Sequence, residues 1–276
     1  MIINFFLKVK DLINIKEFRL RFISTLSLIF SFMLLFLLGN PIISIFFILI
    51  FICVLIEFQL VINLKLKFFD FLKIIFLSSL LFIFFILKVL EIEINNKIFD
   101  NFNLLLLLTL FSNLIFFKNL NNFYTFIFSN LIVIAFFSLI NILLTNHGLN
   151  LFLYLVVLIT TMDVFAYIGG KTFGNKKIVP NISKGKTIEG TLIGLFFTII
   201  ISLVLKDLVN FNVLESITIG FFIGVLAFLG DLLESVFKRN NGVKDSGKLI
   251  PGHGGLLDRF DSYIITLPAL NIFLVN

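Results

Sequence analysis

Long apolar stretches, separated by short polar segments, run through the whole sequence. Each approaches the ~20 residues that an α-helix needs to cross the hydrocarbon core of a bilayer. The nine stretches cover residues 20–38, 41–62, 71–90, 102–117, 124–144, 149–168, 190–206, 217–237 and 257–275. The pattern predicts an all-α, polytopic integral membrane protein with about nine transmembrane helices.

Composition supports a membrane protein and excludes an ordinary soluble domain. Of the 276 residues, 59% are hydrophobic and 14% are charged, whereas soluble domains carry roughly 25% charged residues. Cys53 is the only cysteine, so neither an intrachain disulfide nor a thiolate metal cluster can form.

The positions of the basic residues predict the orientation in the membrane. With the N-terminus inside, the cytoplasmic segments hold 17 Lys and Arg residues, whereas the outer loops hold two, Lys97 and Lys206. This asymmetry follows the positive-inside rule and favours a cytoplasmic N-terminus with an odd number of spans. The net charge is +6, and we expect no nucleic-acid partner.

Polar groups are distributed unevenly between the two halves of the chain. Residues 1–145 hold the first five spans and few polar groups, which is typical of a membrane scaffold. Residues 146–276 hold the last four spans and the two long polar loops, 169–189 and 238–256. We predict one integrated membrane domain in which the C-terminal part carries the chemistry.

A polar stripe lies at the end of the eighth span. Asp231, Glu234, Ser235 and Lys238 are spaced so that they share one helix face. Charges that return to water where a span ends would also explain Lys238 and Arg239. Asp231 fits that explanation less well because it lies about two turns deeper, and ionisable residues at membrane depth usually mark a site.

Two carboxylates open the ninth span. Asp258 and Asp261 lie on one face of the predicted helix, with Arg259 turned away by about 100°. Acidic residues in a first turn can simply complement the helix dipole. Two of them, beside Asp231 on the neighbouring span, instead favour a Mg²⁺ site with oxygen ligands.

The loop between these spans is basic and rich in glycine. Lys244 and Lys248 precede Pro251-Gly-His-Gly-Gly255, where glycines permit backbone amides to approach phosphate oxygens. Many loops contain Gly and Pro for structural reasons only, and His253 alone is more typical of a structural hydrogen bond than of a catalyst.

A further carboxylate and a basic loop lie at the end of the sixth span. Asp163 stands in an otherwise apolar run, which makes a partner or a cation there favourable. The loop that follows contains five lysines, including Lys186, which can contact an anionic headgroup or a triphosphate. The positive-inside rule alone also explains a basic loop.

The segment from Ser235 to Asp261 resembles the signature of the phosphatidate cytidylyltransferase (CDP-diacylglycerol synthase) family. Ser235-Val-Phe-Lys-Arg239, Lys244-Asp245 and Pro251-Gly-His-Gly-Gly-Leu-Leu-Asp-Arg-Phe-Asp261 fill its positions. Asp163-x-x-Ala-Tyr167, Gly230-Asp231-Leu-x-Glu-Ser235 and Ser183-x-x-Lys-Thr187 are also similar to the family's motifs. One departure is Ser-Lys-Gly-Lys-Thr at 183–187, where the family usually has Ser-Pro-Lys-Lys-Thr, so Lys186 is the matched cation.

The resemblance implies an enzyme of phospholipid biosynthesis that joins CTP to phosphatidate and releases pyrophosphate. It implies a homodimer. We expect the bacterial inner membrane as the location, with the active site on the cytoplasmic side, where the positive-inside rule places the two long polar loops. It further implies dependence on Mg²⁺, with K⁺ as a second cation, and metal binding by Asp231 and Asp258, with Asp261 close by.

These observations combine into one prediction of the site. The metal would be held by Asp231, Asp258 and Asp261. The predicted catalytic residues are Asp231, Asp258, Asp261, Lys238, Arg239 and His253. The predicted substrate-binding residues are Asp163, Lys186, Ser235, Lys244, Lys248, Gly254, Gly255 and Arg259.

Other functions remain open on the sequence alone. CTP-dependent polyprenol or phytol kinases also act on a lipid, but they transfer the terminal phosphate and release CDP. A transporter would spread its charges across the membrane depth and often contain a repeat; here the charges gather toward one face. A catalytically inactive scaffold is the third alternative.

Overall fold

The computed structural model describes residues 39–63, 67–90, 123–183, 185–247 and 254–274. The predicted spans at 20–38 and 102–117 lie outside the described residues. Within the described ranges the regular elements are helices, apart from one isolated bridge between Lys177 and Thr187. The all-α class predicted from the sequence is therefore confirmed.

Five of the described helices are long and apolar enough to cross a membrane. They are α3 (Asn40–Asn63), α4 (Phe68–Val89), α6 (Phe123–Leu143), α7 (Gly148–Phe173) and α9 (Val213–Asn240). Shorter elements are α8 (Ile188–Val204), η1 (Lys206–Leu208), α10 (Leu257–Phe260) and α11 (Tyr263–Leu274). The protein is an integral membrane protein, whereas the count of nine spans and the cytoplasmic N-terminus stay predictions.

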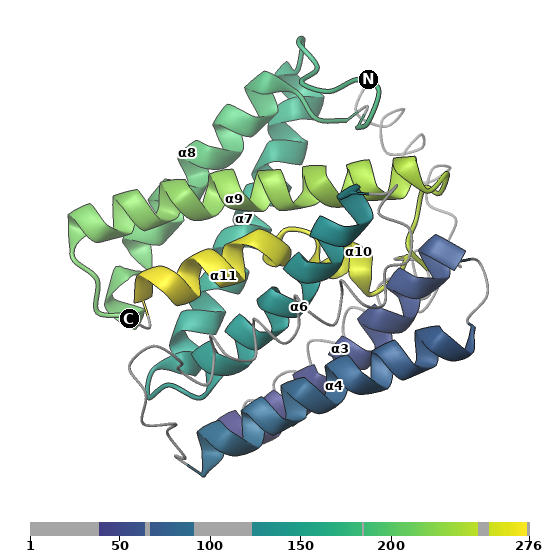
Figure 1. The fold of residues 1–276 in the computed structure, drawn as a ribbon. Coiled ribbons are helices and arrows are strands. Elements are labelled where there is room, and N and C mark those ends of the chain that lie inside the picture. The colour runs from purple at the N-terminus through teal and green to yellow at the C-terminus, as the bar shows by residue number, and fades with distance from the viewer. Residues whose placement is uncertain (1–38, 64–66, 91–122, 184, 248–253, 275–276) are drawn as a thin grey trace, which may run out of the picture.

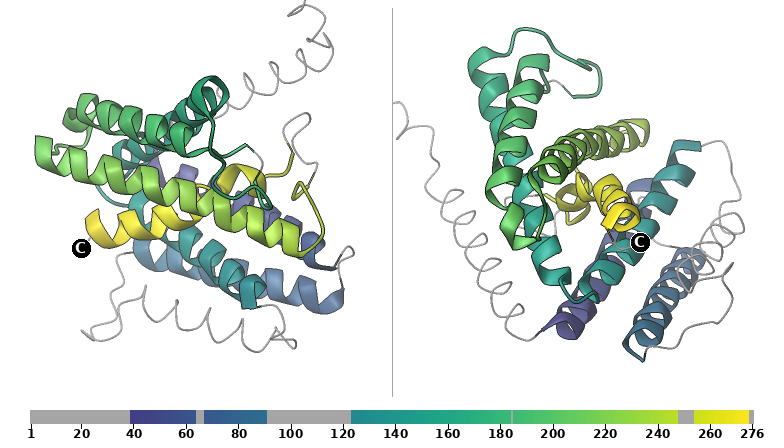
Figure 2. Two further views of the ribbon diagram at one scale, coloured as in Figure 1. Left: turned by 90° about the horizontal axis from the view of Figure 1, so that it is seen from above. Right: turned by 90° about the vertical axis from the view of Figure 1, so that its left-hand side faces the viewer.

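The helices form two groups with α11 between them. On one side α8 packs against both α7 and α9, and on the other α3 packs against α4 and α6 (Figure 1). The short helix α11 contacts α9 on one side and α6 on the other, as the right-hand view of Figure 2 shows. Helices from both halves of the sequence thus meet at α11.

Aromatic rings fix the end of α9 against the N-terminal half. Phe237, which is almost fully buried, stacks on Phe58 of α3 with ring centroids 5.1 Å apart and on Phe128 of α6 at 4.6 Å. Stacked pairs of this kind add about 0.5–1.5 kcal/mol beyond the burial of their surface. The last turns of α9 are therefore held in one position relative to α3.

Small residues allow α7 and α8 to approach each other closely. A Cβ atom added at Gly190 would lie 2.5 Å from the Ala166 carbonyl oxygen, and one at Gly194 would lie 2.8 Å from the Met162 sulfur. Close backbone approach at small residues is a common way for membrane helices to pack. It places the loop before α8 beside α7 and α9.

The predicted ninth span, 257–275, is wrong as a single helix, because it divides into α10 and α11. Asp261 and Ser262 lie at the break, where the Ser262 N–H donates to the Asp261 Oδ1 atom at 2.6 Å. The Asp261 carbonyl also packs on α9, since a Cβ at Gly230 would lie 2.5 Å from it. The side chains of Asp258 and Asp261 therefore do not belong to one continuous helix.

Candidate active site

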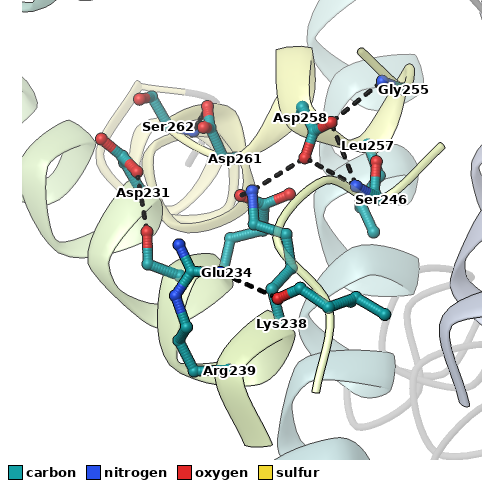
Figure 3. Close-up of polar contacts among 12 residues, drawn as sticks. Asp231, Glu234, Lys238, Arg239, Ser246, Gly255, Leu257, Asp258, Asp261 and Ser262 are labelled. Carbon is teal, nitrogen blue, oxygen red and sulfur yellow. Dashed lines mark hydrogen bonds and ion pairs between the residues drawn. The ribbon is translucent and has the colours of Figure 1, made fainter. Parts of the chain in front are cut away.

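Three carboxylates converge where α9 meets the break between α10 and α11. One oxygen of each of Asp231, Glu234 and Asp261 lies within 4.8 Å of the others. Figure 3 shows Asp231 and Glu234 on α9 facing Asp261. The helical spacing of Asp231 and Glu234 puts both side chains on the face of α9 that is turned toward Asp261.

The chemistry of this cluster suits a hard divalent cation. Glu234 has no exposed surface, and its Oε1 atom lacks a hydrogen-bond partner among the described residues. An unpartnered carboxylate oxygen is costly to bury, and a cation would supply the missing interaction. Oxygen ligands from carboxylates are those that Mg²⁺ prefers, so the residues present fit such an ion.

Lys238 connects this cluster to Asp258. Its Nζ atom lies 2.5 Å from Glu234 Oε2 and 2.8 Å from Asp258 Oδ1. The Lys238 side chain is mostly buried, as are both carboxylates. Removing one member of such a buried group leaves the others uncompensated, at a cost of about 3–5 kcal/mol. The ammonium group is thus fixed beside the three carboxylates.

Asp258 binds the loop rather than the carboxylate cluster. It accepts from the Ser246 N–H, at 3.2 Å to each oxygen, and from the Gly255 N–H at 2.9 Å (Figure 3). Gly254 has a φ of 86°, which glycine adopts at little cost and which lets the chain turn back toward Asp258. Of the three predicted metal ligands, the structure groups Asp231 and Asp261 together with Glu234, while Asp258 pairs with Lys238.

Lys186 approaches the same site from the loop before α8. Its Nζ atom lies 3.0 Å from Asp231 Oδ2, donates to the Phe228 carbonyl at 3.3 Å and stands over the Phe228 ring. Asp163, Lys186, Thr187 and Asp231 line one pocket of about 250 Å³. Lys186 and Asp163, both predicted from the sequence to bind substrate, therefore lie next to Asp231.

The basic loop is attached to α8 by two side chains. Thr187 caps the helix by accepting from the Gly190 N–H at 3.2 Å. Glu189 accepts from the N–H groups of Asn175 and Lys176 at 3.1 and 3.3 Å. Hydrogen bonds from its own N–H and from these two amides lower the pKa of Glu189. Both contacts hold the loop that carries Lys186 at the start of α8.

The remaining predicted residues take several positions. Ser235 donates to Asp231 Oδ1 at 3.4 Å, so it lies within the site. Arg239 donates to the Val243 carbonyl at 2.9 Å, which holds the turn after α9. Lys244 and Arg259 are exposed. Lys248 and His253 lie outside the described residues.

A comparison with known families decides what kind of protein this is. The model of the cytidylyltransferase family matches residues 19–276. The chain belongs to the cytidylyltransferase family. This confirms the family predicted from the signature between Ser235 and Asp261.

Curated relatives resemble this member of the cytidylyltransferase family over part of their length. It is 46% identical over 133 residues to a phosphatidate cytidylyltransferase of Staphylococcus aureus (strain COL), covering 48% of this chain and 51% of that protein. It is 44% identical over 133 residues to a phosphatidate cytidylyltransferase of Staphylococcus haemolyticus, with the same coverage. It is 45% identical over 128 residues to the uncharacterized protein YnbB of Escherichia coli K12, covering 46% and 43%. The match thus spans about half the length of these relatives.

Sequence reasoning gave no role to two acidic residues that the structure places in or near the site of this cytidylyltransferase-family chain. Glu234 was visible on the polar stripe of the eighth predicted span, one turn from Asp231, and that spacing was the available signal. Glu57 is a carboxylate within the second predicted span, 41–62. It accepts from the Leu257 N–H at 2.9 Å, a contact between residues 200 positions apart.

Proposed function

We propose that the protein is a phosphatidate cytidylyltransferase, which transfers CMP from CTP to phosphatidate and so forms CDP-diacylglycerol and pyrophosphate. Membership of the cytidylyltransferase family and the names of the Staphylococcus relatives support this proposal. The observation that carries it is the group of three carboxylates, Asp231, Glu234 and Asp261, with Lys186 and Lys238 in direct contact with it.

The group explains how two polyanions can meet. The reaction forms a bond between a phosphatidate phosphate oxygen and the α-phosphorus of CTP, and breaks the bond from that phosphorus to the oxygen of the leaving pyrophosphate. The attacking phosphate is already anionic, so the site needs no strong general base. It needs positive charge and fixed positions, which are the main contributions to phosphoryl-transfer catalysis.

The side chains divide this task among them. Lys186 is fixed by Asp231 and the Phe228 carbonyl and would contact a phosphate at the mouth of the pocket. Lys238 is held between Glu234 and Asp258 and would keep these two side chains in place. Ser235 would orient Asp231 through its hydroxyl.

Asp231, Glu234 and Asp261 would hold Mg²⁺. When bound, the ion supplies charge neutralisation and orientation for phosphate oxygens. Asp258 would support this group through Lys238. The K⁺ ion implied by the family resemblance stays an expectation without an assigned ligand.

The membrane setting completes the proposal. The bilayer would deliver phosphatidate from the side, and CTP would arrive from the cytoplasm at the cytoplasmic ends of α7 and α9. We propose the bacterial inner membrane as the location, in line with the bacterial relatives, and a homodimer as the assembly.

The test is an assay of the purified protein in mixed micelles with CTP, phosphatidate and Mg²⁺, in which the lipid product and pyrophosphate are both quantified. We expect equal amounts of CDP-diacylglycerol and pyrophosphate, and loss of both in Asp261→Asn. Asp207→Asn, which changes an exposed carboxylate in η1, should match the wild type. Release of CDP in place of pyrophosphate would instead indicate a lipid kinase.

A further inference from the structure

Glu57 is a buried carboxylate on α3, in the half of the chain predicted to be a scaffold. It is 2% exposed and lies six residues before the end of the helix, or about 9 Å along the axis. Ionisable groups at such positions are costly in a membrane and usually have a function and a defined partner. The partners of Glu57 are on the loop that surrounds Asp258.

One oxygen of Glu57 holds both sides of that loop. Glu57 Oε2 accepts from the Leu257 N–H at 2.9 Å and from the Ser246 hydroxyl at 3.4 Å. Ser246 precedes the Gly-rich bend and Leu257 begins α10, so a single carboxylate spans the two ends of the loop. Hydrogen bonds to a carboxylate are roughly twice as strong as bonds between neutral groups.

Two glycines allow the loop to come this close. A Cβ atom at Gly247 would lie 2.5 Å from Glu57 Oε1, and one at Gly255 would lie 2.6 Å from Oε2. A Cβ atom at Gly247 would force the Glu57 carboxylate to shift, and one at Gly255 would in addition lie 2.8 Å from the Gly247 backbone nitrogen. Gly247 and Gly255 therefore allow the backbone to come close to the Glu57 carboxylate.

The residues held by Glu57 are those that bind Asp258. The Ser246 N–H donates to both oxygens of Asp258, and the Gly255 N–H donates to Oδ2. Figure 3 shows Ser246, Gly255 and Leu257 arranged around the Asp258 side chain. Asp258 in turn pairs with Lys238, which pairs with Glu234. A continuous set of contacts thus runs from α3 to the carboxylate cluster.

We propose that Glu57 is a positioning residue of the active site, which sets the place of Asp258 and, through Lys238, that of the metal-binding carboxylates. The proposal rests on the proposed function for its activity readout. It assigns a part of the catalytic machinery to the N-terminal half, which the sequence alone presents as scaffold. Glu57 acts through its oxygen as an acceptor and does not touch the substrates.

Substitutions that separate the acceptor from the side-chain volume provide the test. Glu57→Leu keeps most of the volume and removes the acceptor, and we expect kcat to fall at least tenfold while KM for CTP changes less than threefold, because the loss is in the transition state. Glu57→Gln keeps an acceptor oxygen and should retain at least a third of wild-type kcat. Gln59→Leu is the matched control, since Gln59 is buried on the same helix but points about 200° away from Glu57.

A double mutant tests whether the loop contact itself is responsible. A Cβ atom at Gly247 would meet the Glu57 carboxylate, so Gly247→Ala should disturb the same contact and lower kcat by a similar factor. The combination with Glu57→Leu should lose little more than either change alone, because both remove the same contact. Multiplicative losses in the double mutant would overturn the proposal.

Hydrogen–deuterium exchange separates this proposal from the proposed function, because it requires no turnover. The peptide that covers residues 254–262 should exchange at least tenfold faster in Glu57→Leu than in the wild type. Its exchange rate in Glu57→Gln and in Gln59→Leu should be close to that of the wild type. An inactive wild type with this exchange pattern would contradict only the proposed function. An active Glu57→Leu variant with wild-type kcat, or equal loss of activity in Gln59→Leu, would contradict the positioning role.

Discussion

The Lys238 ammonium lies 2.8 Å from the Asp258 carboxylate and joins the last turns of α9 to the first turn of α10. This ion pair explains how two segments that are separated by a Gly-rich loop keep one geometry. It also gives Asp258 a role that differs from that of Asp231 and Asp261, whose oxygens gather around Glu234.

Lys238→Met should destabilise the protein and abolish activity. The change leaves Glu234 and Asp258 buried without their shared cation, which costs about 3–5 kcal/mol. Unfolding in detergent, followed by circular dichroism, measures the stability. Lys206→Met removes a half-buried lysine whose exposed partner Asp207 lies 3.9 Å away and should change stability by less than about 1 kcal/mol. Equal effects of the two substitutions would show that the Lys238 contacts are unimportant.

Glu234→Gln should raise the Mg²⁺ concentration needed for half-maximal activity at least tenfold. The substitution keeps the size of the side chain but weakens an oxygen ligand of the proposed ion. A Mg²⁺ titration of product formation measures the shift, and Mn²⁺ binding followed by electron paramagnetic resonance provides a readout without turnover. Asp258→Asn should lower kcat with a smaller shift in Mg²⁺ demand. The reverse order of the two shifts would favour Asp258 over Glu234 as a ligand.

Lys186→Ala should lower kcat/KM for CTP by at least tenfold. The variant loses the cation that contacts Asp231 at 3.0 Å and lines the pocket with Asp163. Lys177→Ala, in the same loop, is the control for a general loss of positive charge. Steady-state kinetics at several CTP concentrations distinguish the two variants, and equal losses would argue for a nonspecific electrostatic effect.

The loop before α8 should loosen at acid pH through Glu189. Hydrogen bonds from its own, the Asn175 and the Lys176 N–H groups lower its pKa below the usual 4.5. The folded state is therefore stabilised fully above pH 4.5, and this contribution is lost as the pH falls through the lower folded-state value. Limited proteolysis of this loop should increase over that range in the wild type. In Glu189→Gln, the rate of proteolysis should be the same at neutral and at acid pH. If proteolysis of this variant increased at acid pH as much as that of the wild type, Glu189 would be excluded as the cause.

The sequence predicted the helices well because membrane spans are long and uniform in hydropathy. The predicted span 41–62 differs from α3 by one residue at each end. The predicted span 217–237 is shorter than α9, because Asn212 and Glu215 form a capping box that starts the helix at Val213, and the basic residues Lys238 and Arg239 belong to its last turn. Spans predicted from runs of apolar residues leave out the polar residues at the ends of a helix.

The site was only partly predictable for a different reason. Helical spacing predicted that Asp231 and Glu234 share one face, and the family resemblance predicted that Asp261 lies close to Asp231. Asp258 pairs with Lys238, and the apolar pattern of 257–275 gives no sign of the break at Asp261 and Ser262. The contact between Glu57 and Leu257 joins residues 200 positions apart, and no local pattern in the sequence specifies such a contact.

The fate of the CTP phosphates tests the central claim most directly. The protein is incubated with phosphatidate, Mg²⁺ and CTP that carries a radioactive label on either the α- or the γ-phosphate. We predict that the α-label enters the lipid and that the γ-label appears only in pyrophosphate, with both transfers absent in Asp231→Asn. Transfer of the γ-label to lipid, or no transfer of the α-label by a folded wild-type protein, would contradict the account.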